Sequence, residues 1–175
     1  MADDLFFSAF MTLFVVIDPP GCAPIYAALT KGATTRQVIS IAARACLIAA
    51  AILLVFALFG EQLLGALHIE LNSFRIAGGI MLFMIALEMV FEKRTQRREE
   101  RAEKIKATPE EEDITVFPMA IPMIAGPGSI ATVMLLMARS EGTQATLVIL
   151  SALGAVLLLT FVALIAAGPL LRILG

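Results

Sequence analysis

The sequence is poor in the residues on which most enzymes, metal sites and disulfide-bonded domains depend. Its 175 residues include no tryptophan, one histidine and two cysteines, and only 16% are charged. Cys22 and Cys46 lie in apolar surroundings and are too few for a disulfide framework or a metal cluster, so we expect small buried residues. The sequence has no nucleotide-binding loop, no nucleophile paired with a base and no basic groove. We therefore expect no enzyme, no cofactor, no metal and no nucleic-acid partner.

Apolar residues dominate what remains. They make up 59% of the chain, and the mean hydropathy is +0.92. A soluble domain of this size has too little interior to hide so many apolar side chains. Fifteen of the 28 charged residues fall in residues 92–113, so the rest of the chain is more apolar still. The composition predicts an all-α polytopic membrane protein in contact with the lipid bilayer.

Five apolar segments are each long enough to cross the ~30 Å hydrocarbon layer as a helix. They are residues 5–29, 38–59, 74–91, 114–137 and 146–167. None shows the period-two alternation of a barrel strand. The first segment is interrupted at Asp18-Pro19-Pro20-Gly21, and the fourth at Pro118, Pro122 and Gly126-Pro127-Gly128.

The placement of lysine and arginine predicts the orientation in the membrane. Lys31, Arg36, Arg172 and seven basic residues of the 92–113 linker fall on one side if the five segments alternate. The acidic amino terminus and the expected 60–73 loop fall on the other side and contain no lysine or arginine. Because basic loops stay inside, we expect the amino terminus outside and the charged linker in the cytoplasm, in a bacterial inner membrane.

The two breaks suggest an internal repeat. A shift of 107 residues places Pro20-Gly21 on Pro127-Gly128, at similar depths in their segments. Residues 1–91 would then be a first three-helix repeat, 92–113 a linker, and 114–175 a second repeat of inverted orientation. This 3+3 plan has broken first and fourth helices and needs a sixth helix after Gly168-Pro169, so we expect the sequence to be part of a longer protein.

The breaks are also the predicted binding site. Proline removes a backbone hydrogen bond, so each break should leave two half-helices, the second presenting N–H groups and a positive dipole end. Two such starts meeting near the midplane would hold an anion such as a substrate carboxylate. The predicted substrate-binding residues are Asp18, Pro20, Gly21, Thr30, Gly126, Pro127, Gly128, Ser129 and Thr132.

Each of these residues also has a structural interpretation. The breaks could be packing kinks, and Asp18 could cap the helix that follows it rather than bind an ion, a proton or a substrate ammonium. Thr30, Ser129 and Thr132 could satisfy freed backbone groups or line a path. Weaker site candidates are Arg44 and Arg75, which can reach the membrane surface instead, and Glu88. Gly78-Gly79 predicts a close helix contact.

Three stretches resemble the MarC family of membrane proteins. They are residues 17–25 around Asp18-Pro19-Pro20-Gly21, residues 74–80 from Phe74 to Ile80, and residues 118–130 around Gly126-Pro127-Gly128. The resemblance covers essentially the whole chain and implies six helices and an inner-membrane location. It also implies transport of small neutral amino acids such as alanine or glycine. Members of the family commonly have asparagine where this chain has Asp18.

The favoured function is secondary transport of a small amino acid, with H⁺ or Na⁺ as the coupling ion. A passive small-solute channel is the first alternative, in which Asp18 would be a charge of the pore. A membrane scaffold that does not transport is the second. The sequence leaves the direction of transport and a homo-oligomer open.

The predicted orientation can be tested by labelling single cysteines. A membrane-impermeant thiol reagent should modify Gln62→Cys from the outside and Gln96→Cys only from the cytoplasmic side, because the basic linker stays inside. The unsubstituted protein, whose two cysteines are expected to be buried, serves as the control. Labelling of Gln62→Cys only from the cytoplasmic side would reverse the orientation.

Overall fold

The computed structural model describes residues 2–91, 96, 100, 114–140 and 142–174, the side chains of residues 169–174 excepted. Within these ranges the chain is helical and contains no strand. The elements are α1 (Ala2–Ile17), α2 (Pro19–Leu29), α3 (Thr35–Ala66), α4 (Leu71–Val90), η1 (Thr115–Ile124), α6 (Pro127–Met137) and α7 (Gly142–Leu174). The predicted linker, residues 92–113, lies almost wholly outside the described residues.

Four helical stretches are long and apolar enough to cross a membrane: Ala2–Leu29, Thr35–Ala66, Leu71–Val90 and Gly142–Gly168. Together, η1 and α6 form an apolar pair bent by 50°, which is either a fifth, broken span or a re-entrant loop. The predicted all-α polytopic membrane protein is therefore confirmed, and the repeat stays a prediction. The predicted outer loop at 60–73 is mostly helical, because α3 continues to Ala66 and α4 begins at Leu71.

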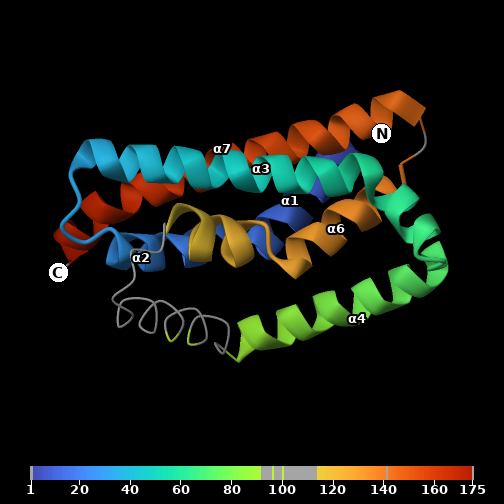
Figure 1. Cartoon of the computed structure of the whole chain (residues 1–175), viewed down its shortest axis with the longest axis horizontal. Coiled ribbons are helices and arrows are strands. Elements are labelled where there is room, and N and C mark those ends of the chain that lie inside the picture. The colour runs from blue at the N-terminus through green and yellow to red at the C-terminus, as the bar shows by residue number, and fades with distance from the viewer. Residues whose placement is uncertain (1, 92–95, 97–99, 101–113, 141, 175) are drawn as a thin grey trace.

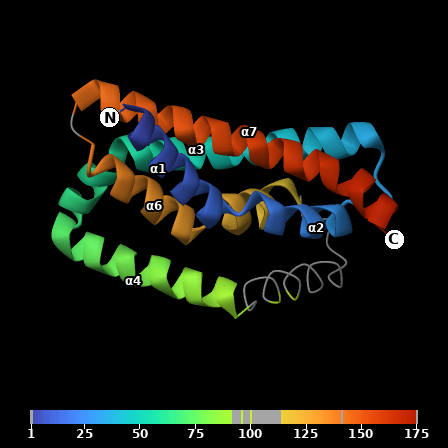
Figure 2. The same cartoon turned by 180° about the vertical axis from the view of Figure 1, so that it is seen from behind.

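The helices lie roughly along one direction (Figures 1 and 2). The end of α2, the start of α3 and the end of α7 gather at one end of the bundle. The amino terminus, the end of α3, the end of α6 and the start of α7 gather at the other. The span formed by α1 and α2 packs along α7, while α3 contacts η1, α6 and α7. The packing of α4 is mainly against α6, at the edge of the bundle.

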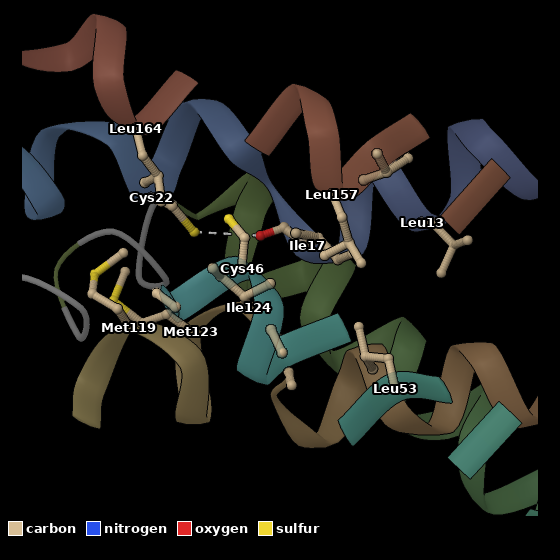
Figure 3. Close-up of a cluster of buried hydrophobic side chains, with 14 of the residues drawn as sticks. Leu13, Ile17, Cys22, Cys46, Leu53, Met119, Met123, Ile124, Leu157 and Leu164 are labelled. Carbon is tan, nitrogen blue, oxygen red and sulfur yellow. Dashed lines mark hydrogen bonds between the residues drawn. The ribbon is translucent and has the colours of Figure 1, made fainter. Parts of the chain in front are cut away.

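Small side chains on α3 bring the helices close together. Ala42, Ala45, Ala49 and Ala57 are buried at helical spacing, and Gly60 continues the same face. Lipid is as apolar as leucine, so membrane helices gain little from burying large apolar groups and associate by close contact of small residues instead. The larger core side chains, among them Leu13, Ile17, Leu53 and Leu157, fill the space between α1, α3 and α7 (Figure 3).

The turn between α2 and α3 is held by side chains at both of its ends. The Tyr26 hydroxyl, fully buried, donates to the Val38 carbonyl and ties α2 to the first turns of α3. Thr34 begins α3 with a reciprocal cap, in which the Thr34 hydroxyl accepts from the Gln37 N–H and the Gln37 side chain accepts from the Thr34 N–H. This arrangement satisfies two N–H groups that the helix start leaves without partners.

Gly78 is the only buried residue of α4. A β-carbon at Gly78 would lie 2.7 Å from Cδ1 of Leu135 on α6, whereas a β-carbon at Gly79 would meet nothing within 4 Å. The predicted close contact at Gly78-Gly79 is thus confirmed for Gly78 and wrong for Gly79, because successive residues of a helix point in different directions.

These two neighbouring glycines provide a matched test of the contact between α4 and α6. Gly78→Val should lower the free energy of unfolding by about 1–3 kcal/mol, since the added side chain collides with Leu135. Gly79→Val should change it by less than about 0.5 kcal/mol, as at an ordinary surface position. Thermal unfolding in detergent measures both. Equal loss in the two variants would show that α4 does not pack on α6 in this way.

Candidate functional site

The first break is built around Asp18, which separates α1 from α2. Its backbone is left-handed, with φ 58° and ψ 65°, a conformation that aspartate tolerates better than most residues. One carboxylate oxygen accepts the Gly21 N–H at 3.0 Å, and the Cys22 N–H donates to the Asp18 carbonyl. Pro19 and Pro20 have no N–H. The expected free donors at the start of α2 are therefore absent, because two are prolines and the next two bond to Asp18.

Gly21 and Cys22 complete this cap. A β-carbon at Gly21 would lie 2.1 Å from Oδ2 of Asp18, so only glycine leaves room for the carboxylate. The Gly21 N–H turns away from the Ile17 carbonyl toward Asp18, and the Cys22 thiol donates to that carbonyl instead, at 3.5 Å (Figure 3). Both cysteines are buried, as predicted, and neither forms a disulfide. The specific role of Cys22 was not predicted, and its only sequence signal is a donor side chain next to the break.

The second break is more irregular than the first. Phe117 and Ile121 have extended backbones within η1, with φ −124° and −128°, as is favoured for residues that precede proline. The chain then turns at Gly126, where a β-carbon would lie 2.3 Å from the Pro122 carbonyl oxygen. Gly126 begins α6 without a side-chain cap. The N–H groups of Gly128 and Ser129 in the first turn of α6 thus have no side-chain acceptor among the described residues.

The two breaks lie side by side in the bundle. A β-carbon at Gly128 would lie 3.4 Å from Cγ1 of Val16, two residues before Asp18, and 2.6 Å from Cδ1 of Ile85 on α4. The two views of the ribbon show the start of α6 beside the junction of α1 and α2 (Figures 1 and 2). Side chains of α1 and α4 occupy the space next to Gly128, so its missing side chain serves helix packing in this conformation.

The remaining predicted site residues divide into two groups. Ser129 and Thr132 lie on the buried face of α6, with 2% and 1% of their surfaces exposed, whereas Pro20 and Pro127 are exposed. Thr30 is far from the breaks, at the end of α2. The hydroxyl groups of Thr30 and Thr132 each donate to the carbonyl four residues earlier, at 2.8 Å and 2.7 Å. Both threonine hydroxyls therefore form hydrogen bonds with backbone carbonyls of their own helices.

The three charged candidates lie on α3 and α4 rather than in either break. Arg44 is exposed on α3, and Glu88 is half-buried near the end of α4. Arg75 donates through an Nη atom to the Ala138 carbonyl at 2.9 Å, and its Nε is buried. Ala138 ends α6, so Arg75 places a positive charge at the negative end of that helix. The described residues contain no cluster of three or more metal-ligating His, Cys, Asp or Glu side chains.

The fold is an all-helical bundle of four membrane-length helical stretches and one bent helix pair, which is the architecture of a polytopic membrane protein. The family described as "MarC family integral membrane protein" matches residues 4–175. This chain belongs to the MarC family.

Curated relatives agree with that assignment. The UPF0056 membrane protein YvbG of Bacillus subtilis is 37% identical over 153 residues, which cover 87% of this chain and 72% of the relative. The UPF0056 membrane protein MJ1677 of Methanocaldococcus jannaschii is 35% identical over 170 residues, or 97% and 82%. The UPF0056 inner membrane protein YhgN of Escherichia coli K12 is 35% identical over 171 residues, or 96% and 81%. No solved structure matches the chain.

The cap at Asp18 can be separated from its charge by two substitutions. Asp18→Asn retains a side-chain acceptor and tolerates the left-handed backbone, so the free energy of unfolding should change by less than about 0.5 kcal/mol. Asp18→Ala removes the acceptor for the Gly21 N–H and should lower the free energy of unfolding by about 2 kcal/mol. Thermal unfolding in detergent compares them. If the alanine variant is as stable as the asparagine variant, the cap contributes nothing.

Proposed function

We propose that this protein is an inner-membrane secondary transporter of small neutral amino acids. The observation that carries the proposal is the meeting of two broken spans, at Val16 on one side and Gly128 on the other. Backbone that leaves the helix at membrane depth is tolerated where protein or a water-filled cavity supplies partners, and broken helices of this kind build the central sites of many transporters.

The chemistry of the two breaks supports a zwitterionic substrate. The start of α6 offers the N–H groups of Gly128 and Ser129 and the positive end of a helix dipole, which suit a carboxylate. Asp18 contributes the negative charge on the other side of the junction, which suits an ammonium group or a coupling H⁺ or Na⁺. The backbone shape at the amino ends of α2 and α6 is set by Pro20, Gly21, Pro127 and Thr132. The binding step requires Ile85 or Val16 to move away from Gly128.

The transport cycle in this proposal is a rearrangement of two repeats around that junction. Residues 1–91 form the first repeat and residues 114–175 belong to the second, inverted one. In the proposed orientation the amino terminus is outside and the 92–113 linker is cytoplasmic. The name of the Escherichia coli relative as an inner membrane protein favours that location for bacterial members.

Uptake by proteoliposomes tests the proposal. Radiolabelled alanine should accumulate above its outside concentration when a Na⁺ or H⁺ gradient is imposed, and unlabelled glycine should compete. A passive channel would equilibrate alanine without accumulating it, and a scaffold would give no flux above empty liposomes. Either result with correctly inserted protein would overturn secondary transport.

The role of Asp18 is tested in the same liposomes. Asp18→Asn should insert normally and keep the helix cap while losing or altering the ion dependence of alanine uptake, because only the charge is removed. Asp3→Asn, an exposed change of the same charge near the amino terminus, is the matched control and should leave the ion dependence unchanged. An unchanged pH and Na⁺ profile in Asp18→Asn would reduce Asp18 to a cap.

A further inference from the structure

A cavity of about 210 Å³ lies at the end of the bundle that contains the amino terminus, away from the two breaks. Its walls come from the last turns of α3, the start of α4, the end of α6 and the first turns of α7. Its polar lining residues are Glu61, Gln62, Ser140 and Thr146, and the two methionines Met134 and Met137 contribute to its apolar wall. No step of the proposed transport site uses these residues.

The polar side chains of this cavity present acceptors rather than donors. The Ser140 hydroxyl donates its hydrogen to the Met137 carbonyl at 2.7 Å, and the Thr146 hydroxyl donates to the Gly142 carbonyl at 3.4 Å. A hydroxyl that has donated its single hydrogen has only lone pairs left to offer. Both oxygens can therefore accept a hydrogen bond from a ligand but cannot donate one.

Gln62 and Glu61 extend the same pattern. In the orientation that satisfies its amide, the Gln62 nitrogen donates to the carbonyls of Leu58 and Phe59, at 3.3 Å and 3.2 Å, which leaves its oxygen as an acceptor. The carboxylate of Glu61, exposed on α3, accepts only. The polar side chains that line the cavity therefore offer acceptors and one negative charge, which suit a cation that carries several N–H donors.

Helix ends of both polarities surround the cavity. Here α3 and α6 end while α4 and α7 begin, so the partial charges of the helix ends oppose one another and Glu61 supplies the charge of the lining. Neither Arg75, which donates to the Ala138 carbonyl, nor Arg139, which lies between the lining residues Ala138 and Ser140, lines the cavity itself. The volume exceeds what one water or one bare metal ion needs, and the methionine wall suits a short alkyl group.

We propose that this cavity binds the ammonium group of a small organic amine, with Glu61 as its counter-charge. The Gln62, Ser140 and Thr146 oxygens accept the remaining N–H bonds, and the alkyl part of the ligand lies against Met134 and Met137. The proposal goes beyond transport at the two breaks and is independent of it, because equilibrium binding needs no translocation.

Equilibrium binding of radiolabelled ethylamine to the full chain in detergent, at constant ionic strength, tests the proposal. Glu61→Gln should weaken binding by about fivefold or more, since it replaces a charge-assisted hydrogen bond by a neutral one of about half the strength. Glu70→Gln is the matched control, an equal change of charge on an exposed residue at the same end that does not line the cavity. It should leave the affinity within about twofold.

A second measurement places the ligand in the cavity. Ser140→Cys introduces a thiol into the lining, and ethylamine should slow its reaction with a charged methanethiosulfonate reagent, whereas propionate at the same concentration should not. The native cysteines are buried, so the unsubstituted protein gives the background. Absence of ethylamine binding, equal loss in the two glutamate variants, or equal protection by propionate would each overturn the proposal. Alanine uptake measured on Glu61→Gln reports transport separately.

Discussion

The hydrogen bond from the Gly21 N–H to Asp18 resolves the main physical difficulty of this fold, which is how to interrupt a helix at membrane depth. In lipid no water is available for the backbone groups that a break releases, and each unsatisfied group costs several kcal/mol. Pro19 and Pro20 have no N–H groups that need an acceptor. The Asp18 carboxylate accepts the Gly21 N–H, and the Cys22 thiol donates to the Ile17 carbonyl. The remaining backbone can then continue as α2, and α1 and α2 together cross as one span.

The second constraint on the fold is that helix backbones must approach one another closely. Apolar side chains are solvated equally well by lipid and by protein, so burying them contributes little to helix association in a membrane. The helices therefore associate through close contacts at positions where the side chains are small. Ala42, Ala45 and Ala49 bring α3 against its neighbours, and Gly78 brings α4 against Leu135. The large apolar residues are divided between the core and the outside, where Leu47, Ile76 and Phe83 are exposed to become a lipid-facing surface.

Much of this architecture could be predicted from the sequence, and the features that could not be predicted have identifiable physical causes. Hydrophobic run length predicted the spans, and proline and glycine predicted both breaks. Run length could not predict that α3 continues past Gly60 to Ala66, because polar residues such as Glu61 and Gln62 form helix as readily as apolar ones. The partners of Arg75 and Cys22 were also beyond prediction. Each depends on a carbonyl made available by a neighbouring break or helix end, which only the three-dimensional arrangement reveals.

The two breaks align in the sequence but differ in chemistry, and this difference bears on any mechanism that treats them as equivalent. At the start of α2 the Gly21 N–H bonds to the Asp18 carboxylate and the Cys22 N–H to the Asp18 carbonyl, while α6 begins after Gly126 without a side-chain cap. An anion approaching the junction would meet the negative charge of Asp18 on one side and the positive end of α6 on the other. Under the proposed function, such a junction would orient a dipolar solute with its negative end toward α6. Asparagine at position 18 would keep the cap but remove the negative charge from this side of the junction.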